Sequence, residues 1–171
     1  MTVLQGSFVY LAAVVLGGSV LVVTRRNPVH SVLWMLLVSV HIAILFVFLN
    51  ADFLAAMQII IYAGAVLVLF LFVLMLLDLR ASDLERRLQN QWPLGVILAT
   101  SFLVLFGVVL SRSRTQVEPG TYTVNFIQGE GNVSTVGKVL FSDFILPFEI
   151  ASLILLVAIL GAVVLAIKKV R

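Results

Sequence analysis

The sequence predicts an all-α membrane protein built from five transmembrane helices. Of its 171 residues, 62% are hydrophobic and only 11% are charged, and the mean hydropathy is +1.20, whereas a soluble domain is about a quarter charged. Five apolar runs are each long enough to cross the roughly 30 Å hydrocarbon core of a bilayer as a helix. We expect one membrane domain, residues 1–171, with spans at about 3–23, 28–49, 53–77, 92–111 and 146–167.

The ends of the runs carry signals that are typical of helix boundaries. No basic region precedes the first run, so we expect a retained span and not a cleavable signal. Asn27 and Pro28 suit the cap and first turn of the second helix. The third run has 25 residues without a formal charge between Asp52 and Asp78. Trp92 and the proline after it are expected to mark an interfacial start of the fourth helix.

The links between the runs are unequal. The first two are short and force antiparallel neighbours. The third, Asp78–Gln91, contains SDLERRL and predicts a short amphipathic or extended helix at the membrane surface. The fourth link, residues 112–144, is polar and includes TYTVNFIQ, whose alternation is typical of a strand. There we expect an outer surface hairpin or loop.

The distribution of basic residues predicts an outer N-terminus and an inner C-terminus. Cytoplasmic loops are enriched in Lys and Arg. With this orientation the inner side carries eight such residues and the outer side carries three. The inner residues are Arg25, Arg26, Arg80, Arg86, Arg87, Lys168, Lys169 and Arg171, and the outer ones are Arg112, Arg114 and Lys138.

The composition excludes several classes of site. The chain has no cysteine, so it cannot form a disulfide, ligate an iron–sulfur cluster or build a thiolate zinc site. His30 and His41 alone cannot make a metal or haem site. The net charge of +3 follows from membrane topology, so nothing supports nucleic-acid binding. No pattern of nucleophile and base or of a phosphate-binding loop is present.

The candidate functional residues are polar groups and a glycine inside the membrane. Gln58 and Tyr62 lie four apart in the third run and should share a helix face. They could form interhelical hydrogen bonds, or they could line a hydrated path. Gly64 lies between two alanines, where a π-bulge would meet little steric resistance. Close helix packing at this glycine is the simpler alternative from the residues alone.

Glu149 is the only carboxylate well placed to enter a span. An acidic group at the bilayer centre costs about 2.5–3.5 kcal/mol, but Glu149 lies about one turn after Leu146, so its cost should be lower. It is either an interfacial acid near the helix start or a member of a proton route or subunit contact. His30 and His41 are eleven residues apart, on one side of the second run, where each is expected to be hydrogen bonded. A proton relay through His41 is the alternative, although the sequence shows no partner for it.

Two patterns of small residues predict close helix contacts. Ala13 and Gly17 lie four apart in the first run, and Ala158 and Ala162 lie four apart in the fifth. Such pairs let helix backbones approach in a membrane, although they also occur often by chance in apolar helices.

Three segments resemble a known family. They are QIIIYAGAVLVLFLFVLML (58–76), LPFEIASLILLVAILGAVVLA (146–166) and NPVHSVLWMLL (27–37). They resemble chain J of proton-translocating NADH:quinone oxidoreductase, the counterpart of subunit 6 of mitochondrial complex I. Members of that family often carry glutamate where this chain has Gln58, and glutamine cannot release a proton.

The resemblance implies a non-redox subunit in the membrane arm of complex I, with no catalytic centre of its own, in a bacterial-type inner or plasma membrane. Its partners would be lipid and the quinone-site subunit, the small three-helix subunits and the antiporter-like subunits. FMN, iron–sulfur clusters and quinone would bind to other subunits, and this chain would bind no cofactor or metal.

The resemblance also favours a π-bulge at Tyr62–Val66 over simple packing, because in this family the third helix is known for one that relaxes by rotation. Gln58, Tyr62 and Gly64, with Glu149 as a secondary candidate, would then help couple quinone reduction to proton translocation. Two alternatives remain, namely a purely structural membrane subunit and a subunit of a multisubunit cation/proton antiporter.

Overall fold

The computed structural model describes residues 3–77, 92–112, 120 and 122–167, and within them every regular element is helical. Within these described residues, five helices are long and apolar enough to cross a membrane. They run over Val3–Thr24, Pro28–Phe48, Asp52–Leu76, Trp92–Arg112 and Ile145–Ala166. The predicted all-α fold with five transmembrane helices is therefore confirmed.

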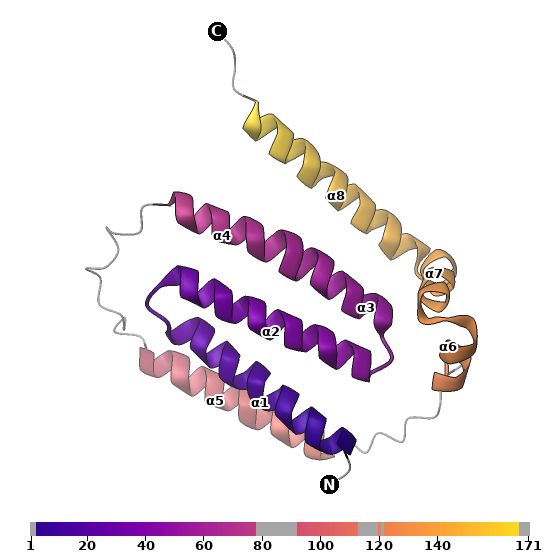
Figure 1. The fold of residues 1–171 in the computed structure, drawn as a ribbon, viewed down its shortest axis with the longest axis horizontal. Helices are drawn as coiled ribbons and strands as arrows, with labels where there is room; N and C mark the ends of the chain where they lie inside the picture. The colour runs from indigo at the N-terminus through magenta and orange to yellow at the C-terminus, as the bar shows by residue number, and fades with distance from the viewer. Residues whose placement is uncertain (1–2, 78–91, 113–119, 121, 168–171) are drawn as a thin grey trace.

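The first three spans pack side by side as antiparallel neighbours, with α2 (Pro28–Phe48) in the middle (Figure 1). On one side α2 contacts α1 (Val3–Thr24), and on the other it contacts the third span. The start of α2 is fixed as the sequence predicts, since Asn27 accepts a hydrogen bond from Val29 N at 2.9 Å and Pro28 occupies the first turn. Most of the buried apolar residues lie between these three helices.

The closest approach of α1 and α2 occurs at Gly18. A Cβ atom added there would lie 2.6 Å from Cγ2 of Val38, so only glycine fits without a shift. The prediction that Ala13 and Gly17 make this contact was wrong, because both are exposed and a Cβ at Gly17 would meet nothing within 4 Å. The rotation of α1 places the adjacent glycine against α2 instead.

The described part of the polar link before the last span, residues 122–144, is helical. It forms α6 (Val124–Glu130) and α7 (Asn132–Ser142), and this corrects the strand expected for TYTVNFIQ, whose residues from Val124 onward belong to α6. Thr123 caps α6 by accepting a hydrogen bond from Phe126 N at 3.3 Å. A capped turn satisfies backbone groups locally, whereas a strand would need a partner strand. The amphipathic helix expected in Asp78–Gln91 lies outside the described residues.

The last two spans differ from the first three in burial. Every residue of α5 (Trp92–Arg112) and α8 (Ile145–Ala166) is exposed. Helix α5 overlaps α1 in Figure 1, and α8 leads away from α7 toward the C-terminus. Ala158 and Ala162, predicted to make a close contact, are exposed with the rest of α8.

Candidate functional site in the third span

The third span contains a π-helical segment. It begins as α3 (Asp52–Met57), continues as η1 (Gln58–Val66, nine residues) and ends as α4 (Leu67–Leu76). Leu67 N–H donates to Tyr62 O, five residues back, which is the hydrogen-bond register of a π-helix. The π-bulge expected at Tyr62–Val66 is therefore present, within a longer segment that starts at Gln58.

Gly64 lies in the middle of η1 and is exposed in this chain. A Cβ atom added at Gly64 would lie 3.4 Å from the carbonyl oxygen of Ile59, and no atom of another helix is among its neighbours within 4 Å. Ile59 is five residues earlier in the same helix, so this neighbour belongs to the π register itself, and at 3.4 Å it is an ordinary van der Waals contact. Gly64 therefore has room for a Cβ atom in this conformation.

Gln58, the first residue of η1, is tied to α2. Its Nε2 donates to Oγ of Ser39 at 2.9 Å, and Ser39 is only 5% exposed. At the other end of the segment, Leu67 is 3% exposed and is the most buried residue of the span. The π segment therefore lies between a polar contact at its start and an apolar one at its end.

Ser39 is the residue that the sequence analysis missed. It is a polar residue deep in the second run, and a search for every hydroxyl inside a span would have found it. The signal is ambiguous, because serine in an apolar helix often bonds to its own backbone four residues back. Ser7 and Ser19 do so in α1.

The other two candidates do not join this contact. Tyr62 is 54% exposed, although its spacing from Gln58 predicts a shared face. Glu149 lies in the second turn of α8 and is exposed, and its carbonyl accepts a hydrogen bond from Oγ of Ser152 at 2.7 Å. Among the described residues no interaction joins Glu149 to Gln58, Tyr62 or Gly64. The structure thus places three candidates on one segment and the fourth on a separate helix.

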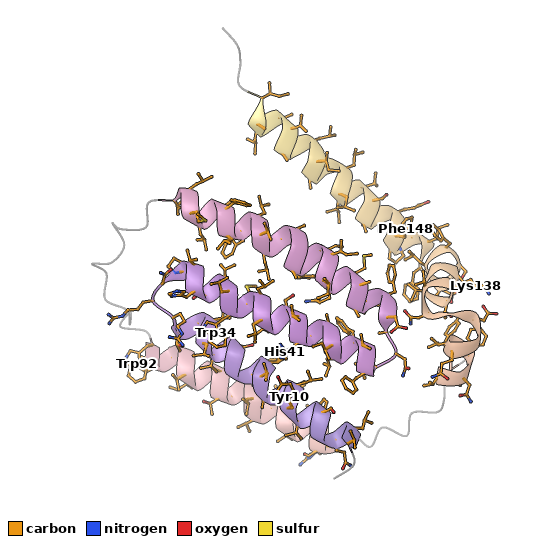
Figure 2. All side chains as sticks on the ribbon, viewed as in Figure 1. Tyr10, Trp34, His41, Trp92, Lys138 and Phe148 are labelled. Atoms are coloured by element: carbon orange, nitrogen blue, oxygen red, sulfur yellow. The ribbon has the colours of Figure 1, made fainter. Side chains whose placement is uncertain are left out.

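His41 forms a second polar position, between α1 and α2 (Figure 2). Its Nδ1 lies 2.8 Å from Leu37 O, and since a carbonyl can only accept, Nδ1 carries the proton. Its ring lies 6.0 Å from that of Tyr10 between centroids. His41 is therefore hydrogen bonded, as the sequence predicts. His30 is exposed.

Within the described ranges, no group of three or more His, Asp or Glu side chains is arranged to hold a metal ion. The arrangement at the start of the third span is thus a widened helical turn held at one end by an amide–hydroxyl hydrogen bond. Such π segments occur frequently at functional sites.

Comparison with known proteins places the chain in a family. The family of NADH-ubiquinone/plastoquinone oxidoreductase chain 6 matches residues 18–165. A protein of Rickettsia felis named NADH-quinone oxidoreductase subunit J is 39% identical over 171 residues, covering 95% of this chain and 80% of its own length.

Two further relatives agree. The subunit J of Rhodobacter capsulatus is 36% identical, covering 98% of this chain and 84% of its own length. The NADH-ubiquinone oxidoreductase chain 6 of Marchantia polymorpha is 34% identical, with coverages of 95% and 85%. With the five apolar helices described above, these matches show that the chain belongs to the family of subunit J, or chain 6, of NADH-quinone oxidoreductase, and that it is a multi-pass membrane subunit.

Proposed function

We propose that this chain couples quinone reduction to proton translocation in a membrane-bound NADH:quinone oxidoreductase through a switch in its third span. The observation that carries the proposal is the π segment Gln58–Val66 inside a membrane-crossing helix. A π segment is less well packed than an α-helix, and such segments occur frequently at functional sites.

The switch would work by rotation. An α-helix turns by about 100° per residue, so returning the extra residue to α-helical register would rotate α4 by about that angle relative to α3. Leu67 would then leave its buried position, and a different face of α4 would meet α2. In this way a hydrated face of α4, beyond the π segment, can be exchanged for an apolar face that excludes water.

Gln58 would act in this switch as an anchor. Its amide cannot release a proton, and its bond to Ser39 ties the start of the π segment to α2. Protons would therefore pass along water or through groups of partner subunits. Tyr62 is exposed on this chain and would face those partners.

The redox chemistry would take place elsewhere. FMN, iron–sulfur clusters and quinone would be bound by other subunits, and this chain would bind none of them. Its neighbours would be the quinone-site subunit, the small three-helix subunits, the antiporter-like subunits and lipid.

A purely structural subunit is the second candidate, and the Gln58–Ser39 contact favours it, because such hydrogen bonds also serve only to hold helices together. An antiporter subunit has less support, because the relatives carry the names of NADH-quinone oxidoreductase subunits. The first two candidates differ in what a change at Gly64 does.

Replacing Gly64 with valine tests the switch. The Cβ itself would make only an ordinary van der Waals contact with Ile59 O, at 3.4 Å, but the branched, stiff valine side chain is poorly tolerated in a helix, so we expect the π form to be disfavoured by about 1 kcal/mol. In an assembled complex, purified on a tag attached to this chain, we expect quinone reduction by NADH to fall about fivefold or more. Gly64→Ala adds only the Cβ and is the matched control. Normal turnover and pumping by an assembled Gly64→Val enzyme would rule out the switch.

The orientation is also part of the proposal, with the N-terminus outside and the C-terminus inside a bacterial-type plasma membrane. The chain has no cysteine, so single cysteines can be placed at Lys138 and Arg26 and labelled in intact cells with a membrane-impermeant reagent. We expect labelling at 138 only. Labelling at position 26 alone would show that the orientation is the opposite of the one proposed.

A further inference from the structure

The side chain of Asn132 binds both ends of the connection between α2 and α3. Its Nδ2 donates to Asn50 O at 3.0 Å, and its Oδ1 accepts from Phe53 N at 2.9 Å. These partners precede it by 82 and 79 residues in the sequence. Asn132 is the first residue of α7 and is half-buried. The amide therefore fixes α7 to the start of the third span.

The bond to Phe53 replaces a missing helix cap. The first amides of a helix have no intrahelical acceptor, and usually a Ser, Thr, Asp or Asn at the cap position accepts from the second or third residue. In α3 the cap position is Ala51, which makes no side-chain hydrogen bond. Phe53 is the second helical residue. Asn132 thus supplies from another helix the acceptor that Ala51 lacks.

The bond to Asn50 holds the turn itself. Asn50 adopts a φ of 56°, a left-handed conformation that asparagine tolerates better than most residues. The amides of the turn find acceptors within α2, since Asn50 N donates to Val47 O and Ala51 N donates to Phe46 O. The carbonyl of Asn50 accepts from Asn132. The tight turn is therefore completed by a residue of α7.

A cap from a distant helix differs from a local cap in one consequence. A serine at position 51 would hold the start of α3 wherever α7 lay, whereas Asn132 can do so only while α7 stays in place. Helix α7 ends at Ser142 and α8 begins at Ile145, so α7 also contacts the fifth span. The π segment begins five residues after Phe53, roughly 8 Å further along the helix axis.

We propose that Asn132 is a positioning residue that ties the third span to α7, so that movement of α7 and α8 is passed to the π segment. This inference rests on the proposed switch. It predicts that capping the third span and coupling it to α7 are separable, although in this chain one side chain performs both.

Two variants separate these roles. Asn132→Ala removes both hydrogen bonds. Ala51→Ser added to Asn132→Ala restores an acceptor for the start of α3 but no tie to α7. Hydrogen exchange of the Phe53 amide reports on the cap. It should speed up by roughly two- to thirtyfold in Asn132→Ala, the factor that corresponds to a lost cap, and return toward normal in the double variant.

The deciding measurement is quinone reduction and proton translocation by the assembled complex in inverted membrane vesicles. We expect the protons moved per NADH to fall at least about twofold in Asn132→Ala and to stay low in the double variant. Ser134→Ala, an exposed position on the same helix, should match the unaltered complex. Full recovery in the double variant would show that Asn132 is only a cap and would overturn the inference.

Two further outcomes complete the test. If Asn132→Ala alone prevents assembly, the double variant with Ala51→Ser is measured by itself, because its third span is capped again but has no bond to α7. Normal coupling in that variant would overturn the tie. Gly64→Val separates this failure from that of the proposed switch. If Gly64→Val is impaired while the Asn132 variants are normal, only the tie fails. If Gly64→Val is also normal, the switch fails with it.

Discussion

The first three spans and the last two are similarly apolar, but they differ in burial. The described spans from Val3 to Leu76 cover part of their surface against one another, and they contain all six buried apolar residues of the structure. Helices α5 and α8 contain none, and every residue in them is exposed. Hydropathy alone does not distinguish the two groups of spans, since the mean hydropathies of α5 and α8 lie within the range of those of the first three spans.

The difference lies in small and polar residues at specific positions. Gly18 lets α1 approach α2, and Ser39 gives Gln58 a partner across the next interface. Helix α8 has small residues too, yet none of the described residues of this chain covers them. In a membrane, apolar surface alone does not drive helices together. The last two spans must therefore be covered by lipid or by other subunits.

Among the variants that test this difference in burial, Gly18→Val should have the largest effect on the stability of the chain. Its Cβ would lie 2.6 Å from Val38 Cγ2, and overpacking of this kind costs about 1–3 kcal/mol. We expect the chain expressed alone in membranes to lose heat stability after extraction in mild detergent, measured as the temperature at which half of it aggregates.

Gly107→Val on α5 is the matched control for that change. A Cβ at Gly107 would meet nothing within 4 Å, so the heat stability of the isolated chain should stay the same. If it fell as far as in Gly18→Val, the contrast between the two regions would be wrong. A loss of complex assembly in Gly107→Val alone would instead identify α5 as a subunit contact.

A smaller effect is expected from the Ser39–Gln58 hydrogen bond. Interhelical hydrogen bonds in membranes average about 0.6 kcal/mol, so a cycle of Ser39→Ala, Gln58→Ala and the double variant should give a coupling energy near that value. The measurement is unfolding of the isolated chain in mixed detergent micelles. Strictly additive effects of the two changes would mean that the bond contributes nothing to stability.

The sequence predicted the helices well because their signals are local. Apolar length, charge-free runs and the Asn27–Pro28 start are all readable within one segment, and the structure confirms five long helices. The π segment was expected only with the help of a family resemblance. From the residues around Gly64 alone, packing was the simpler interpretation, and the π register is seen only in the backbone of Gln58–Val66.

The wrong or missed predictions concern features that depend on the rotation of a helix about its axis or on contacts between residues that are distant in the sequence. Ala13 and Gly17 have the right spacing, but the face that α1 turns toward α2 carries Gly18. The strand expected at TYTVNFIQ became a helix capped by Thr123. The contact of Asn132 with Phe53 spans 79 residues, and no periodicity in one sequence can reveal such a pair.

The smallest effect should come from Glu149→Gln, which tests the exposed region. Glu149 lies on α8 with no residue of its helix buried. Its charge therefore does little within this chain, and the unfolding temperature of the isolated chain should change by about 2 °C or less. Glu130→Gln, which removes the ion pair with Lys138, is a control with a similarly small expected effect, because exposed pairs contribute little.

If Glu149→Gln lowers proton translocation of the assembled complex and leaves the isolated chain unchanged, the carboxylate acts on a partner or a proton route. If it destabilises the isolated chain, α8 must pack against the rest of the bundle, and the contrast between the two regions fails.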